Sequence, residues 1–311
     1  MSGLFSALWK IVSTQSLYAS MFRFTTFLTF AAAGEWVAEK AGTLNISVEA
    51  MLLCGAYATA VGSDLTHSTF GGLCCGALAG LAVAAFQANL SHRLTANPFV
   101  VGLTLNVLAA GLTAFLNAEF KSNARKAAVI RVPLLHRIPG IGTALFANPW
   151  PAYLIYAIVP GVAWLVHRTR WGLEVRSVGE NPQAADVSGI HVNKRRRQAI
   201  YVCGITSGLG GAYLILGLVN LFTRDMTGGQ GFIAIAAVIF GGWTLRGAVA
   251  GCLVFGTAEA LASVVPNLGY RLSPELLASF PYVLTLFVML FFARRTRQPA
   301  ALARPFVRGL T

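Results

Sequence analysis

Apolar stretches of membrane-spanning length recur along the whole chain. Hydrophobic runs punctuated by glycine, proline or charged residues lie near positions 15–37, 46–63, 69–89, 97–118, 150–168, 198–220, 231–243, 245–266 and 280–293. A helix of about 20 apolar residues crosses the hydrocarbon core of a bilayer. The runs 46–63 and 231–243 are short and flanked by glycines, so we interpret them as half-helices or re-entrant segments. The pattern predicts an all-α, polytopic transmembrane bundle of about eight to ten membrane segments, in a single domain over residues 1–311.

Composition narrows the class of protein further. Of the 311 residues, 56% are hydrophobic and 11% are charged, whereas about 25% are charged in ordinary globular domains. A soluble core cannot bury this much apolar surface, which excludes a soluble enzyme, a disordered chain and a disulfide scaffold. The five cysteines lie in or beside apolar runs without CxxC spacing, and HExxH and GxSxG motifs are absent from the sequence. We therefore predict packing thiols, no metal site and no membrane-embedded enzyme.

The formal charge of +13 reflects membrane topology rather than binding to nucleic acid, because the basic residues fall mostly between apolar runs. The segment 168–197 holds seven Lys and Arg residues, so we expect it in the cytoplasm. Four apolar runs separate it from the basic tail 294–311, which predicts a cytoplasmic C-terminus. The 119–149 loop should then lie outside, although it carries five basic residues. Contact with an acidic binding protein is our hypothesis for that loop.

An internal similarity relates two parts of the chain. Laying Gly55 on Gly241 pairs ISVEAMLLCGAY (46–57) with FIAIAAVIFGGW (232–243). Each copy then runs into small residues four positions apart, which allow helices to approach closely: Gly72, Gly76 and Gly80 in the first, Gly247 and Gly251 in the second. The similarity predicts two related halves; the alternative is that glycine-rich apolar helices resemble one another by composition.

Two stretches place polar groups inside apolar sequence. Asn45 and Glu49 lie four residues apart and so share one helical face, and Asn106 lies in the middle of a run. A carboxylate in hydrocarbon is costly, so Glu49 should face protein or a water-filled cavity. It either lines a path through the membrane or joins helices by a hydrogen bond.

Glycines precede the short run at 231–243. They permit unwound backbone, which at membrane depth is tolerated only within protein or along a cavity; a tight turn at the membrane surface is the alternative. Aromatic side chains here could stack on a planar solute. The predicted lining of a solute path comprises Asn45, Glu49, Asn106, Gly229, Gly231 and Phe232.

The basic segment also contains the signature of a short helix. Asn181 can cap a helix, Pro182 suits its first position, and Gly189 suits its C-terminal end. Such a helix between two membrane spans is either a docking element or a solvated connector.

Four stretches together resemble a known family of membrane proteins. They are AGTLNISVEAMLLCGAYATA (41–60), NPFVVGLTLNVLAAGLT (97–113), WGLEVRSVGENPQAADVSGIHV (171–192) and GGQGFIAIAAVIFGGWTLRGAVAGCLVFG (228–256). The chain resembles the permease subunits of ABC importers in the branched-chain amino acid, ribose and nucleoside superfamily, most closely the shorter permease of bacterial nucleoside or simple-sugar systems. Ala50 stands where the family usually has glycine.

The resemblance implies a transport subunit of the bacterial inner membrane, carrying nucleosides or related sugars delivered by an extracytoplasmic binding protein. The loop 169–197 would then carry the coupling helix that contacts a cytoplasmic ATPase. The residues implied in coupling are Gly179, Glu180, Asn181, Ala184, Ala185, Asp186, Gly189 and Ile190.

The partners implied are the ATP-binding subunits and a second, longer permease. The sequence lacks a GxxxxGK[ST] run, so ATP would be bound by a partner and this chain would hold no cofactor. An ion-coupled secondary transporter is the alternative. It should show several carboxylates at membrane depth, whereas only Glu49 and Glu259 are evident candidates.

Overall fold

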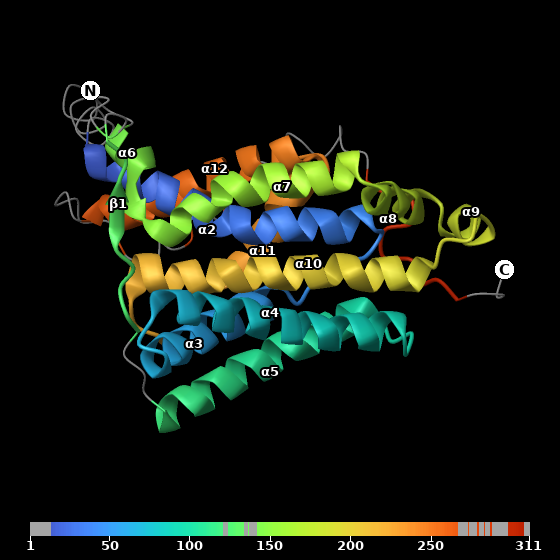
Figure 1. Ribbon diagram of the computed structural model, residues 1–311, viewed down its shortest axis with the longest axis horizontal. Coiled ribbons are helices and arrows are strands. Elements are labelled where there is room, and N and C mark those ends of the chain that lie inside the picture. Colours follow the sequence, from blue (N-terminus) through green and yellow to red (C-terminus); the bar gives the residue numbers. More distant parts are fainter. Residues whose placement is uncertain are drawn as a thin grey trace.

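The computed structural model describes residues 14–120, 124–133, 136, 142–266, 273, 279, 283, 287 and 298–307. The helices form an elongated bundle with a small two-stranded sheet at one end (Figure 1). The elements are α2 (Gln15–Lys40), α3 (Val48–Leu65), α4 (Thr69–His92), α5 (Pro98–Glu119), β1 (Val129–Arg131), α6 (Gly142–Phe146), β2 (Ala147–Pro149), the 3₁₀ helix η2 (Trp150–Leu154), α7 (Ile155–Arg168), α8 (Arg170–Glu180), α9 (Pro182–Val187), α10 (Val192–Tyr213), the π-helical η3 (Leu214–Val219), α11 (Gln230–Phe240) and α12 (Leu245–Val264).

Each predicted apolar run before residue 267 corresponds to a helix. Within the described residues, five helices are long and apolar enough to cross a membrane: α4, α5, η2 with α7, α10 with η3, and α12. The chain is therefore a multi-pass, all-α membrane protein, as predicted. The predicted run at 280–293 lies largely outside the described residues. The two short runs form α3, an unbroken helix of 18 residues, and α11, a helix of 11 residues. Neither is among the five candidate spans, so their interpretation as half-helices or re-entrant segments stays a prediction.

The bundle is organised around α2 and α10, which run antiparallel. The end of α2 meets the start of α10, where Arg196 donates to Ala41 O, and Phe30 near the middle of α2 packs against Gly210 late in α10. Helix α4 packs along α10, and α12 packs along α2. In the first half of the chain, α2 leads into a hairpin of α3 and α4, and α4 packs on α10 of the second half. In the second half, α10 leads into a hairpin of α11 and α12, and α12 packs on α2. Because α2 and α10 run antiparallel, the two halves are inverted.

Small residues make these contacts close, as the glycine spacing predicts. A Cβ on Gly80 would lie 2.7 Å from Gly208 Cα of α10, and one on Gly34 of α2 would lie 2.6 Å from Cys203 Cα. In the second half, a Cβ on Gly256 would lie 2.9 Å from Thr25 Cα of α2. Interhelical contacts in membranes depend on such close van der Waals packing, because lipid provides little hydrophobic drive between helices.

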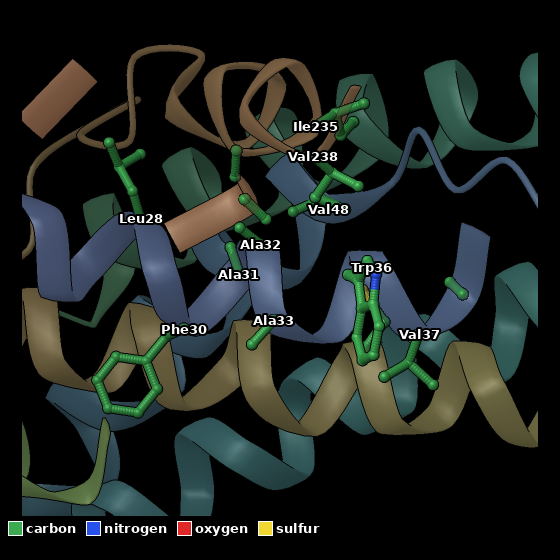
Figure 2. Close-up of a cluster of buried hydrophobic side chains, with 14 of the residues drawn as sticks. Leu28, Phe30, Ala31, Ala32, Ala33, Trp36, Val37, Val48, Ile235 and Val238 are labelled. Atoms are coloured by element: carbon green, nitrogen blue, oxygen red, sulfur yellow. The ribbon is translucent and has the colours of Figure 1, made fainter. Parts of the chain in front are cut away.

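Helix α2 is buried on every side along its second half. All residues from 26 to 39 are buried, and Figure 2 shows Phe30, Ala33 and Val37 projecting over the ribbon of α10, while Val48 and Val238 reach α2 from α3 and α11. A helix that is buried all round forms the centre of its bundle. The polar residues of α2 are consequently enclosed by protein rather than by lipid.

The two ends of the bundle carry different loops. At one end α8 and α9 project beyond the helices, and residues 298–307 join them (Figure 1). At the other end β1 pairs antiparallel with β2, and Ala127 N donates to Leu216 O of η3. The basic 168–197 segment and the described part of the tail therefore share one end, while the 119–149 loop lies at the other.

Candidate functional site

The carboxylate of Glu49 joins the first turns of two helices from opposite halves of the chain. Glu49 lies in the first turn of α3, and its oxygens accept hydrogen bonds from Thr227 Oγ1 (2.5 Å), Gly229 N (2.9 Å) and Gly231 N (2.6 Å) at the start of α11. The free N–H groups of a helix N-terminus favour a negative charge. Glu49 is 7% exposed, so this contact, which we call the Glu49 clasp, closes α3 against α11.

The backbone before α11 is shaped to meet this carboxylate. Gly228 and Gly229 have φ values of 51° and 82°, a region that side chains rarely occupy. A Cβ on Gly231 would lie 2.6 Å from Glu49 N, so only glycine allows this approach without a shift. The predicted unwound segment is thus a turn that presents N–H groups to Glu49.

Asn106 fixes the beginning of α3 from the neighbouring helix α5. Its Oδ1 accepts a hydrogen bond from Ala50 N (3.0 Å), and its Nδ2 donates to Ile46 O (3.0 Å). Both amide atoms are therefore used by the backbone of one segment. In this conformation Asn106 attaches α5 to the start of α3.

Asn45 is completely buried between the turn after α2 and α10. Its Nδ2 donates to Cys203 Sγ (3.3 Å), and its Oδ1 accepts from Ser47 Oγ (2.8 Å). The thiol of Cys203 in turn donates to Glu35 Oε2 (3.4 Å). This chain of contacts connects both halves through protein.

The structure therefore brings the predicted lining residues together around the start of α3, but the polar side chains among them are hydrogen-bonded within the protein. Phe232, at 42% exposure, is the member with open surface, and it lies beside Gly231 in the first turn of α11. A separate cavity of about 620 Å³ adjoins that turn and is lined by Arg23, Met226 and Gln230, among others.

Two carboxylates were missed by the sequence analysis. Glu35 and Glu39 of α2 are fully buried, so Glu49 and Glu259 are not the only carboxylates that the described helices enclose. The predicted run 15–37 contains Glu35, but hydropathy does not show that other helices surround α2, which continues past that run to Lys40. The number of carboxylates consequently does not separate an importer permease from an ion-coupled transporter.

Helix α9 has the ends that the sequence predicts. Asn181 Oδ1 accepts from Ala184 N (3.0 Å), Pro182 occupies the first position, and Gly189 has a φ of 84° just after the helix. Ile190 N donates to Ala185 O (3.0 Å), which closes the C-terminal turn. These caps satisfy the free backbone groups of a six-residue helix that would otherwise be unstable.

The burial of α9 corrects the predicted docking surface. Ala185 is 5% exposed and packs with Val178 and Val192, so it faces the bundle rather than a partner. Gly179 is also buried, with space for a Cβ blocked by Gly42 N at 3.1 Å. The outward face consists of exposed side chains, including Val187, which is 91% exposed and was not predicted. Of the predicted coupling residues, Glu180, Asn181, Ala184 and Gly189 are exposed, and Asp186 and Ile190 are half-buried.

A buried arginine ties this end together. Arg196 of α10 donates to Ala41 O (3.3 Å), Ala301 O (3.4 Å) and Arg304 O (2.7 Å). Ala301 N donates to Gly179 O (2.9 Å), so the tail residues 298–307 bridge α8 and the end of α2. We call this arrangement the tail strap.

Known proteins of similar sequence are permease subunits of ABC transporters. A nucleoside ABC transporter permease, NupC of Lactococcus lactis, is 33% identical over 94% of this chain and 97% of its own length. A guanosine ABC transporter permease, NupQ of Bacillus subtilis, is 31% identical over 91% and 93%. A Haloferax volcanii protein described as a putative glucose ABC transporter permease, TsgC13, is 31% identical over 92% and 95%.

The family model described as the permease component of branched-chain amino acid transport systems matches residues 17–293. That range includes the Glu49 clasp, α9 and both inverted halves. The chain belongs to this family of permease components of ABC importers.

Proposed function

We propose that this chain is the permease subunit of an ABC importer for nucleosides or related simple sugars. Family membership supports a transport role, and the two nucleoside permeases among the relatives support this solute class. A sugar permease at similar identity keeps related sugars within the proposal. ATP is bound by partner subunits, so the permease supplies the path and the coupling contact rather than a cofactor site.

The capped, projecting helix α9 is the observation that carries the coupling role. A conformational change in an ATPase moves membrane helices only if the ATPase contacts the two states of the permease differently. Helix α9 presents Val187 and Ala184 outward and is anchored on its inner side by Ala185. A push on the outer face therefore reaches α8 and α10 through packed side chains.

The basic end of the bundle is assigned to the cytoplasm of the bacterial inner membrane. Arg93, Arg168, Arg195 and Arg246 lie at or beside helix ends here, together with other Lys and Arg residues of the 168–197 segment. Cytoplasmic loops carry an excess of such residues close to membrane spans. The same assignment places the C-terminus in the cytoplasm and the β1–β2 loop outside, where an extracytoplasmic binding protein would deliver solute.

The solute path is placed beside the first turn of α11. Phe232 offers an open aromatic face there, and the 620 Å³ cavity carries Arg23 and Gln230 at the outer end. Gln230 Oε1 is buried without a hydrogen-bond partner within the described residues, so it is available to a solute hydroxyl or amine. The Glu49 clasp then acts as a closed contact beside the path. A second permease subunit, a longer relative of this chain, completes the path.

The coupling role is tested with two substitutions in α9. We expect Val187→Asp to leave the assembled transporter intact but to lower ATP-driven uptake into proteoliposomes at least tenfold, because a charge interrupts the contact with the ATPase. Ala185→Asp should instead reduce assembly, because it buries a charge within the bundle. Normal uptake by an assembled Val187→Asp transporter would contradict the docking role of α9.

A further inference from the structure

A second cavity opens between α2, α7 and the turn before α12. It lies at the end of the bundle that carries α8 and α9. It has a volume of about 510 Å³, and Lys40, His167 and Arg246 line it together with two tryptophans. We propose that this cavity binds the phosphate headgroup of an anionic phospholipid. Basic pockets between membrane helices on the cytoplasmic side are suited to such headgroups.

Two of the three basic side chains of the cavity are available to an anion, whereas His167 Nδ1 lies within hydrogen-bond distance of Ala163 O (3.0 Å). Within the described residues, the side chains of Lys40 and Arg246 form no ion pair or hydrogen bond. The ion pair that the described residues contain joins Arg195 to Glu174, and neither residue lines the cavity. Two charged residues of α8 interact electrostatically with Lys40: Glu180 attracts its ammonium group and Arg176 repels it. Glu39 is fully buried below the surface. Lys40 and Arg246 therefore bring two cationic side chains without an ion pair to the cavity, and Glu180 and Glu39 are the carboxylates that attract Lys40.

The start of α12 adds to this positive potential. Thr244 caps the helix by accepting from Gly247 N (3.1 Å), and Thr244, Leu245 and Arg246 all line the cavity. The N-terminal end of a 20-residue helix carries a partial positive charge. An anion in the cavity is thus favoured by a helix end as well as by side chains.

The floor of the cavity is rigid. Trp36 Nε1 donates to Trp243 O (2.8 Å), both side chains are buried, and the Trp36 ring stacks on His167 with centroids 5.6 Å apart. Trp243 has a φ of 54°, a strained value that persists only where the surroundings impose it. The binding surface is therefore formed before any ligand arrives.

The rim of the cavity lies at the level of the lipid headgroups. On α7, the exposed residues Tyr156, Pro160 and Trp164 form one face that leads to His167, and Trp164 is 62% exposed. On α12, Arg246 begins an exposed stripe that continues through Ala250 and Leu253. Tryptophan marks the membrane interface, and basic side chains extend toward headgroups there. These apolar stripes leave room for acyl chains beside the cavity, which favours a lipid over a soluble phosphate.

The proposal is tested by native mass spectrometry on the assembled transporter, titrated with phosphatidylglycerol and phosphatidylcholine of identical acyl chains. We expect phosphatidylglycerol to bind more tightly. Each cation near a charged membrane surface contributes about a fivefold gain, so Lys40→Gln and Arg246→Gln should each weaken phosphatidylglycerol binding about fivefold, and together about twenty-five-fold. Binding of phosphatidylcholine should not change.

Arg93→Gln is the matched control, because Arg93 is exposed at the same end but does not line the cavity; it should bind phosphatidylglycerol as the wild type does. Equal affinity for the two lipids, or unchanged phosphatidylglycerol binding in both single variants, would overturn the proposal. Displacement of the lipid by millimolar inorganic phosphate would identify a soluble anion as the ligand instead. If the assembled transporter did not bind phosphatidylglycerol, the lipid proposal would be overturned, and a protein partner that covers the cavity would be indicated instead.

Discussion

At the scale of single residues, Glu49 holds together segments that are 180 positions apart in the chain. Its two oxygens receive three donors from the turn before α11. Asn106 secures the other side of the same helix start through two backbone hydrogen bonds. The beginning of α3 is therefore fixed from both halves, and any opening of this region must break charge-assisted hydrogen bonds.

We expect Glu49→Gln to lower the free energy of unfolding by about 2 kcal/mol, because the amide nitrogen would face a backbone N–H and leave it unsatisfied. Reversible unfolding in mixed micelles measures this change. Glu259→Gln is the matched control, since Glu259 is a half-buried membrane carboxylate of α12 for which the described residues provide no hydrogen bond. Equal effects of the two substitutions would contradict the clasp.

Asn106→Leu should lower the free energy of unfolding by about 1–3 kcal/mol, because it leaves Ala50 N and Ile46 O unpaired. Thr104→Val on the same helix removes a hydroxyl that is exposed and bonds only to Val100 O of the preceding turn, so it should have little effect. Thermal unfolding of both variants in detergent compares them directly. Equal stability of the Asn106→Leu and Thr104→Val proteins would contradict the two hydrogen bonds from Asn106 to the backbone of Ala50 and Ile46.

The sequence predicted that Asn45, Glu49, Asn106, Gly229 and Gly231 belong together, but it could not predict which atoms pair. Polar residues in apolar runs indicate contact with protein or water, whereas pairing across 180 residues depends on the packing of the halves. The buried position of Glu35 and Glu39 was missed for a related reason. Hydropathy does not show which helix lies at the centre of a bundle, where the surrounding helices can enclose a carboxylate.

At the scale of elements, α9 and the tail strap form one unit at the end of the bundle. Helix α9 packs its inner face on α8 and α10, and the tail contacts Gly179 and Gly42 through backbone hydrogen bonds. Arg196 donates to both the end of α2 and the tail. Movement of α9 is therefore transmitted to the two central helices rather than lost in a flexible loop.

Arg196→Met should release the tail strap, because three carbonyl groups lose their donor. We expect the amides of Ala301 and Ala303 to exchange hydrogen about tenfold faster or more, as each 1.4 kcal/mol of lost local stability raises the open population tenfold. Hydrogen exchange with mass spectrometry on the peptide 298–307 measures this. Arg195→Met is the control, because Arg195 bonds to Glu174 and Gln198 instead; equal exchange in both variants would contradict the role of Arg196.

The caps of α9 were predicted correctly because they depend on local residue types at fixed spacing. Which side of the helix faces outward was not, since six residues give too short a pattern to reveal a buried face. Ala185, a predicted contact residue, is buried for this reason, and the exposed Val187 was not among the predicted residues.

At the scale of the whole molecule, inverted halves place the hairpin of each half on the long helix of the other. The lengths of the apolar runs predicted the helices. The internal similarity and its glycine spacing predicted that two halves are related. The sequence could not predict that α4 packs on α10 and α12 on α2. Small residues at regular spacing show that helices approach closely, but they do not show which helices pair.

The most direct test of this account is uptake of radiolabelled guanosine, uridine and ribose by cells with and without this gene, after ATP depletion and, separately, after collapse of the proton gradient. The account predicts that nucleoside uptake falls when the gene is deleted and follows ATP rather than the gradient. Uptake that instead follows the gradient and persists without ATP would contradict it, and α9 would then be only a connector between spans.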